Sequence, residues 1–139
     1  MILAVLAAAW ANPVFPGGWT PGIHWVEGEA AGLAASHNAG DRALLLDFRA
    51  DWCAACGELD TESWPDRRVV EAARDFIAVR LDCTDSDNAA VKALIARYNV
   101  RGLPTVLWTT ADGHELARSV GFVQPEALLA RFALAMGQL

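Results

Sequence analysis

Three short apolar segments constrain the fold of this chain more than any other feature of its sequence. They are the runs ALLLDFR at 43–49, FIAVRLD at 76–82 and TVLWTT at 105–110. Continuous apolar runs of this length are typical of strands that are covered on both faces. Outside them the pattern changes to a helical period, over 53–62, 66–74 and 86–98. Strands that alternate with helices in this way predict parallel pairing within one central sheet.

The remaining segments complete the predicted architecture. An alanine-rich stretch at 27–38 is expected to form a helix before the first strand, and Ser86 is the expected N-cap of the helix at 86–98. The turn residues at 111–113 predict a hairpin into a last strand at 114–121. Pro125 then begins a final helix that extends to about residue 136. We therefore predict an α/β fold in which a mixed central β-sheet is flanked by helices on both faces.

Composition and charge exclude some classes of protein. The chain has 139 residues, of which 54% are hydrophobic, enough for one domain with a substantial core. Its formal net charge is −6, and its basic residues are scattered instead of forming a stripe. A typical nucleic-acid-binding surface is therefore excluded. We expect a monomer with no nucleic-acid partner.

The first 26 residues are expected to lie outside the folded domain, which we place at 27–139. Residues 1–11, MILAVLAAAWA, form a signal-like apolar segment that is too short to cross a membrane. Two alternatives remain open, the remnant of a longer membrane segment and a disordered apolar end. Residues 12–26 form a Pro- and Gly-rich lead-in, whose Trp19, Ile23 and Trp25 are expected to pack against the domain. A signal or a membrane segment would place the domain outside the cytoplasm.

The sequence DWCAACGELD at 51–60 places Cys53 and Cys56 where the first buried strand ends and a helix begins. Unpaired N–H groups and the helix dipole stabilise a thiolate there, and the thiolate is the species that attacks disulfides. Cys56 follows one turn later, close enough to form a disulfide with Cys53. A metal site would need more ligands than Cys83 and the widely spaced histidines supply. A purely structural disulfide would constrain almost no loop, so the pattern favours a redox pair, with Cys83 as a buried free thiol.

The segment LLLDFRADWCAACGELD, together with RGLPTVLW at 101–108, resembles the thioredoxin superfamily. Within that superfamily, the resemblance is greatest to the C-terminal periplasmic domains of the DsbD thiol–disulfide interchange proteins, and it extends from about residue 43 to residue 136. The matching features are an aspartate six positions before the first cysteine, Asp-Trp-Cys-x-Ala-Cys, and Gly-Leu-Pro-Thr about fifty residues later. The resemblance implies the thioredoxin fold and a redox-active Cys-x-x-Cys centre.

Four residues acquire catalytic roles from this resemblance. Cys53 would attack a client disulfide, and Cys56 would resolve the mixed disulfide. Asp47 lies within an apolar strand, where burial raises the pKa of a carboxyl, and it would accept the proton of Cys56. Asp60 would place negative charge near Cys53 and raise the pKa of its thiol. The alternatives are that Asp47 points to water and that Asp60 belongs to a solvated helix face.

Three further residues are implied in client binding. The Leu103–Pro104 bond would be cis and face the cysteines, since X–Pro bonds are those for which the cis form costs little. The backbone beside Pro104 would pair with an incoming chain as an added strand. Trp52 would pack beside the reactive sulfurs. For Pro104 the alternative is a trans proline at the start of a strand.

Two departures from the family pattern concern the redox properties. Gly57 follows the second cysteine where relatives often have lysine, so that no redox potential can be transferred to this chain. Ala54 and Ala55 lack the histidine of strongly oxidising relatives. Without an imidazolium to stabilise the thiolate, the pair is expected to be a reductant or a neutral exchanger.

The sequence thus predicts a protein-disulfide reductase, an extracytoplasmic thiol–disulfide oxidoreductase with no cofactor or metal besides its Cys53–Cys56 disulfide. Its partners would be oxidised client proteins and an upstream dithiol donor such as a membrane reductase. The protein would be periplasmic or otherwise extracytoplasmic, either exported or membrane-tethered. An oxidase or isomerase would use the same cysteines in the other direction. A non-enzymatic metal-handling or binding module on the same fold is the second alternative.

Overall fold

The computed structural model describes residues 22–139, so the predictions for residues 1–21, including that for Trp19, lie outside this range. The elements of the described chain are, in order, β1 (Val26–Glu27), α2 (Glu29–Asn38), β2 (Leu44–Arg49), α3 (Ala54–Glu58), the π-helical turn η1 (Leu59–Ser63), α4 (Arg67–Ala73), β3 (Ile77–Asp82), α5 (Ala89–Arg97), β4 (Thr105–Thr109), β5 (Glu115–Val120) and α6 (Pro125–Met136). None of the helices within residues 22–139 combines the length and the apolar character that crossing a membrane requires.

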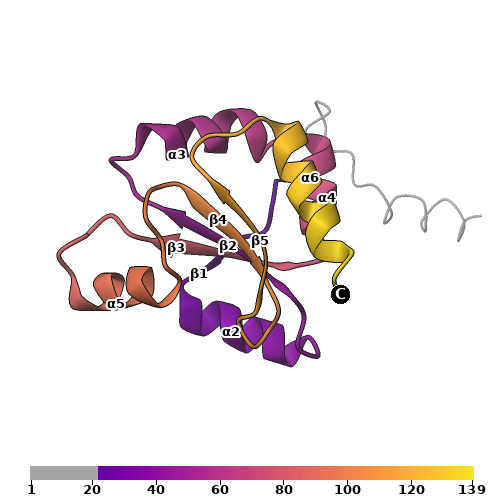
Figure 1. Ribbon diagram of the computed structural model, residues 1–139, viewed down its shortest axis with the longest axis horizontal. Coiled ribbons are helices and arrows are strands. Elements are labelled where there is room, and N and C mark those ends of the chain that lie inside the picture. The colour runs from indigo at the N-terminus through magenta and orange to yellow at the C-terminus, as the bar shows by residue number, and fades with distance from the viewer. Residues whose placement is uncertain (1–21) are drawn as a thin grey trace, which may run out of the picture.

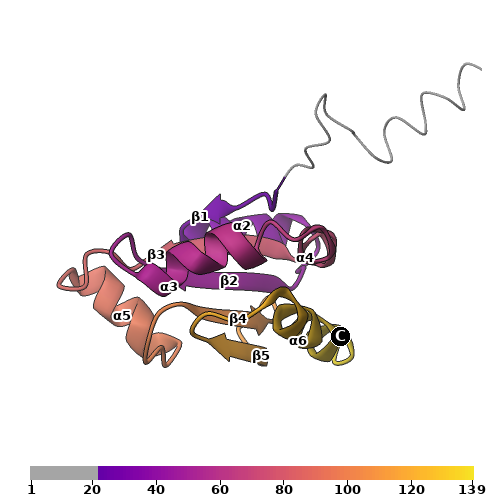
Figure 2. The same ribbon diagram turned by 90° about the horizontal axis from the view of Figure 1, so that it is seen from above.

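The strands of residues 22–139 form one mixed sheet in the order β1-β3-β2-β4-β5. β1, β3 and β2 are parallel, whereas β4 is antiparallel to β2 and β5 is antiparallel to β4. β1 and β5 lie at opposite edges of the sheet, as Figures 1 and 2 show. Helices α3, α4 and α6 cover one face, and α2 and α5 cover the other (Figure 1). These observations confirm the predicted mixed α/β sheet.

Alternate residues of β2 contribute to two separate hydrophobic cores. Leu45 packs into the core beneath α3, α4 and α6, which also contains the fully buried Trp108. Leu44 and Leu46 face the opposite core, together with the free Cys83. Period-two alternation places successive side chains on opposite faces of a strand. Because both faces are packed, the end of β2 is a firm support for the residues that follow it.

The amino-terminal edge of the sheet contains a strand that the sequence pattern did not predict. β1 consists of Val26, the last residue of the predicted lead-in, and Glu27, where the first helix was expected to begin, and both residues pair with β3. Ile23 and Trp25, immediately before it, pack against the core beneath α3, α4 and α6, as expected. This segment therefore packs against the core from residue 23 and joins the sheet at Val26.

The first helix begins at Glu29 instead of residue 27, and two further helix boundaries differ from the prediction. α5 begins at Ala89, and its N-cap is Asn88 instead of the expected Ser86, because the Asn88 side chain accepts hydrogen bonds from the N–H groups of Ala90 and Val91. The helix expected over 53–62 is shorter, since α3 is followed directly by η1. Within η1 the N–H of residue 64 bonds to the carbonyl of residue 59 at 2.9 Å, a wider turn than that of an α-helix.

Candidate active site

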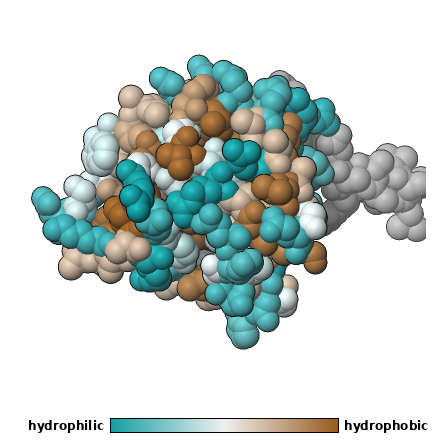
Figure 3. Space-filling model, in the orientation of Figure 1, coloured by the Kyte–Doolittle hydropathy of each residue, from teal (hydrophilic) through white to brown (hydrophobic). Residues whose placement is uncertain are grey.

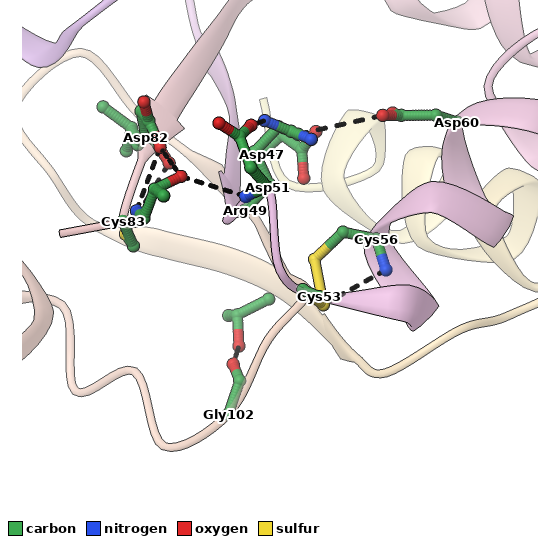
Figure 4. Close-up of a disulfide and its surroundings, with 12 residues drawn as sticks. Asp47, Arg49, Asp51, Cys53, Cys56, Asp60, Asp82, Cys83 and Gly102 are labelled. Carbon is green, nitrogen blue, oxygen red and sulfur yellow. Dashed lines mark hydrogen bonds and ion pairs between the residues drawn. A yellow bond between two sulfur atoms is a disulfide. The ribbon is translucent and has the colours of Figure 1, made fainter. Parts of the chain in front are cut away.

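Cys53 and Cys56 form a disulfide at the start of α3 (Figure 4). Their Cα atoms are 5.2 Å apart. Cys53 is the N-cap residue of α3, and its Sγ accepts a hydrogen bond from the Cys56 N–H at 3.2 Å. Cys53 is half-buried, whereas Cys56 is 1% exposed. The pair therefore presents one accessible sulfur that receives a helix N–H group and one sheltered sulfur.

The residues before Cys53 are held by the loop between β3 and α5. The N–H of Asp51 donates to Thr84 Oγ1 at 2.9 Å, and the indole Nε1 of Trp52 donates to the Thr84 carbonyl at 3.0 Å. Thr84 is in turn fixed by its N–H, which donates to Asp82 Oδ1 at 2.9 Å. Trp52 nevertheless remains 62% exposed. Its ring is thus an oriented apolar surface adjacent in sequence to Cys53.

The Leu103–Pro104 peptide bond is cis, as the resemblance implied. Pro104 is buried, and its carbonyl accepts a hydrogen bond from the Gly121 N–H at 2.8 Å. Thr105 Oγ1 donates to the Gly102 carbonyl at 2.6 Å, and Figure 4 draws Gly102 among the surroundings of the disulfide. The N–H and carbonyl of Leu103 have no backbone hydrogen-bond partner within residues 22–139. The expected pairing of this backbone with another chain stays a prediction.

Asp47 lies in the middle of β2 and is 1% exposed, so the alternative in which it points to water is wrong. Its Oδ2 is 3.5 Å from Arg80 Nε on β3, a charge contact without hydrogen-bond geometry. Its Oδ1 is buried and has no hydrogen-bond partner within residues 22–139. Burial raises the pKa of the Asp47 carboxyl from 3.8 to about 7, although the charge of Arg80 lowers it. Asp47 is therefore able to take up and release a proton near neutral pH.

Asp60 faces arginine side chains instead of open solvent. Its side chain is 27% exposed; one carboxylate oxygen accepts a hydrogen bond from Arg80, and Oδ2 is 3.7 Å from Arg49 Nε. Figure 4 shows Asp47, Arg49 and Asp60 together on one side of the disulfide. The negative charge of Asp60 also raises the pKa of Asp47. The expected influence of Asp60 on the Cys53 thiol stays a prediction.

Sequence reasoning missed Arg80 and Arg49, the cations of this group. Arg80 lies within the second apolar run, and it occupies in β3 the position that Asp47 occupies in β2, because the register pairs these two residues. Opposite charges at equivalent positions of two buried, neighbouring parallel strands are a signal that could have revealed the pair. Arg49, at the end of β2, contacts both Asp60 and the exposed Asp51.

The third cysteine belongs to the core. Cys83 follows β3, is buried, and its thiol donates to the Leu81 carbonyl at 3.6 Å. Burial raises the pKa of this thiol to about 11, which disfavours the reactive thiolate. Within residues 22–139 no group of three or more histidine, cysteine, aspartate or glutamate side chains is arranged to hold a metal ion.

Comparison with known sequences identifies relatives of the chain. The family model of a thioredoxin-like domain matches residues 30–135. DsbD, the thiol:disulfide interchange protein, of Pseudomonas fluorescens is 38% identical over 106 residues, which cover 75% of this chain and 18% of that protein. DsbD of another Pseudomonas species is 44% identical over 72 residues, or 52% of this chain and 12% of that protein. The chain thus spans less than a fifth of the length of these curated relatives.

Solved structures give the same assignment. The reduced C-terminal domain of Neisseria meningitidis DsbD superimposes with a TM-score of 0.68 at 25% identity, covering 78% of this chain and 97% of that chain. A thioredoxin from Thermus thermophilus superimposes with a TM-score of 0.69 at 20% identity, covering 84% of this chain and 88% of that one, which shows the fold alone. The chain has the thioredoxin fold and belongs to the thioredoxin-like domain family.

Proposed function

We propose that this domain is an extracytoplasmic thiol–disulfide oxidoreductase that reduces disulfides of client proteins. The observation that carries the proposal is the disulfide between a half-buried Cys53 at a helix N-cap and a buried Cys56. Similarity to DsbD proteins, which are named for thiol:disulfide interchange, supports the activity and the location outside the cytoplasm.

The reaction begins with the reduced form of the cysteine pair. The Cys53 thiolate attacks one sulfur of a client disulfide, the client bond breaks, and the other client sulfur leaves as a thiolate that takes a proton from water. Asp47 then accepts the proton of the Cys56 thiol. The Cys56 thiolate attacks Cys53 Sγ, the mixed disulfide breaks, and the second client sulfur leaves and is protonated. Two electrons have passed to the client, and the disulfide seen in this structure is the oxidised product.

Return to the reduced state requires an upstream dithiol donor, and a membrane reductase would meet this need. One donor thiolate attacks the Cys53–Cys56 disulfide, and the second donor thiol resolves the resulting mixed disulfide. The donor is thereby oxidised to a disulfide while both cysteines of the domain are reduced. No cofactor or metal takes part in this cycle.

The charged group beside the disulfide supports the proton transfer. With a pKa of about 7, the Asp47 carboxyl is partly ionised at neutral pH and can receive a proton that an ordinary aspartate would hold only weakly. Asp60 contributes to this raised pKa through its negative charge. We assign Asp47 the role of proton acceptor and Asp60 the role of a positioning residue that acts through it and, as expected from the sequence, on Cys53.

Client binding is proposed to use the backbone beside the cis-proline and the exposed indole. The unpaired backbone groups of Leu103 can hydrogen-bond to an extended client segment as an added strand. Trp52 offers an oriented apolar surface for the same segment. On the face shown in Figure 3, apolar patches alternate with polar side chains, which fits the proposal that the domain acts as a monomer.

The exchange mechanism is tested by trapping its intermediate. Cys56→Ser, in a Cys83→Ala background that removes the third thiol, should accumulate mixed disulfides between Cys53 and a disulfide-containing client such as insulin. The adduct is measured by non-reducing electrophoresis and mass spectrometry. Cys53→Ser in the same background is the matched control and should form few adducts, because its remaining sulfur is sheltered. Absence of an adduct with Cys56→Ser would contradict the mechanism.

The direction of electron flow is tested by equilibration with glutathione. A reductase should become oxidised while most of the glutathione remains reduced, and each tenfold change in the equilibrium constant corresponds to about 30 mV. A pair that remains reduced in an excess of oxidised glutathione would instead identify an oxidase or isomerase. Stoichiometric metal in the reduced protein together with no reduction of insulin would favour the non-enzymatic alternative.

A further inference from the structure

Trp25 connects the amino-terminal edge of the sheet with the cluster of charged side chains that contains Asp47, Asp60 and Arg80. It immediately precedes β1, which pairs with β3 through only two residue pairs, Val26 with Val79 and Glu27 with Arg80. The centroid of the half-buried Trp25 ring is 4.6 Å from Arg80 Cζ, a cation–π contact. The position of Arg80 is thus linked to a short edge strand.

Arg80 has few other contacts that fix its guanidinium group. It donates a hydrogen bond to Asp60 and lies 3.5 Å from Asp47, but its Nε has no hydrogen-bond partner within residues 22–139. A long side chain whose guanidinium makes a single hydrogen bond retains several rotamers unless a further contact restricts it. The indole face of Trp25, 4.6 Å from Arg80 Cζ, adds a stacking contact that restricts the plane of the guanidinium.

Trp25 also contacts the segment that carries Asp60. Its ring is 5.1 Å from the ring of Trp64, at an interplanar angle of 76°. Trp64 is the C-cap residue of η1, the turn that contains Asp60. One side chain therefore touches both the strand that carries the cation and the helical turn that carries its anionic partner.

We propose that Trp25 is a positioning residue that holds the Arg80 guanidinium between Asp47 and Asp60, so that the amino-terminal edge strand controls how readily Asp47 accepts a proton. The titratable and charged groups that influence Asp47, taken element by element, are Arg80 on β3, Cys83 after β3, Asp60 on η1 and Arg49 on β2. Its neighbour on β4 is the uncharged Val106.

The direction of the effect follows from these neighbours. Arg80 is the largest influence that lowers the pKa of Asp47, while burial and the charge of Asp60 raise it. When the guanidinium is no longer held, Asp47 loses its main counter-charge but stays buried beside Asp60. Its pKa then rises further above the ordinary range, and the protonated carboxyl cannot accept the proton of Cys56 at neutral pH.

The proposal is tested by titrating Asp47 in the oxidised full-length protein. The ¹³C signal of its carboxyl is followed by NMR in the wild type, in Trp25→Leu, which keeps apolar bulk without a ring, and in Trp25→Phe. The control is Ile23→Ala, a change in the same segment and against the same core. Trp25→Met replaces Trp25→Leu if the leucine variant does not fold.

In Trp25→Leu the midpoint of the Asp47 titration should move to higher pH by at least about half a unit, a roughly threefold change in the proton affinity of this carboxyl. Trp25→Phe should restore most of the wild-type behaviour, and Ile23→Ala should titrate like the wild type. An unchanged midpoint in Trp25→Leu overturns the proposal, as does an equal shift in the Ile23→Ala control, which would indicate general loosening of the segment.

The consequence for exchange rests on the proposed function. In single-turnover reactions, the pH profile for client release by Cys56 should move to higher pH in Trp25→Leu with the same plateau rate. The two ideas fail separately. If the Asp47 titration shifts in Trp25→Leu but the wild type never exchanges disulfides, the proposed function is refuted and the role of Trp25 stands. If the wild type exchanges disulfides but the Asp47 titration is unchanged in Trp25→Leu, the role of Trp25 is refuted and the proposed function stands.

Discussion

Replacing Asp47 with asparagine should make the folded domain more stable at alkaline pH and leave its stability nearly unchanged near pH 4. Folding raises the pKa of this carboxyl from 3.8 to about 7. Between these values the folded state binds more protons than the unfolded chain, so the free energy of unfolding falls as the pH rises. The difference of about three units between the folded and unfolded pKa of Asp47 corresponds to about 4 kcal/mol of stability lost at alkaline pH. An uncharged asparagine can remove at most this loss.

The measurement compares urea unfolding of the wild type and Asp47→Asn at pH 4 and pH 8, with the disulfide kept oxidised. The difference in free energy of unfolding between Asp47→Asn and the wild type should increase by between about 1 and 4 kcal/mol from pH 4 to pH 8. Asp85→Asn, which removes an exposed carboxylate in the loop before α5, controls for net charge and should show little of this gain. Equal pH dependence in the wild type and Asp47→Asn would refute the claim that burial of the charge dominates at this position.

Two further predictions concern local packing and helix capping, and urea unfolding measures both. Gly32→Ala should lower the free energy of unfolding by about 1–3 kcal/mol, since the new Cβ would lie 2.5 Å from a valine methyl of β3. Gly57→Ala, whose Cβ would meet nothing within 4 Å, should instead add up to about 1 kcal/mol. Asn88→Ala should cost about 1 kcal/mol through loss of the cap. Ser86→Ala should change stability by less than about 0.5 kcal/mol, and a larger loss there would contradict the observed cap.

The parts of the fold that sequence predicts are those that depend on local patterns. The apolar run around Leu45 forms a strand because both of its faces are buried. α6 begins at Pro125, because the fixed φ angle of proline favours the first position of a helix. The position of Cys53 at the start of a helix follows from the same change of period. Burial of Asp47 was expected because it lies within an apolar run that predicts a strand covered on both faces.

The parts that sequence does not predict depend on register and on loop geometry. The pairing of Asp47 with Arg80 exists only because β2 and β3 align in one register, which neither run specifies alone. β1 has two residues and therefore no period to detect. Ser86 and Asn88 are both good N-cap residues. The N–H of Asn88 donates to the carbonyl of residue 85, and the resulting turn places Asn88 at the start of α5.

The incomplete hydrogen bonding of Asp47 fits the proposed proton transfer better than it fits a purely structural role. A buried carboxylate that served only the fold would be expected to have both oxygens bonded, because unsatisfied polar groups are costly. Additional donors would also lower its pKa and remove it from the neutral range. Arg80, in charge contact but without hydrogen-bond geometry, opposes burial only in part and leaves Oδ1 open. The loss of stability at alkaline pH and the capacity to accept a proton near neutral pH are therefore two consequences of one arrangement, and a variant that adds a hydrogen bond to Oδ1 should lose both.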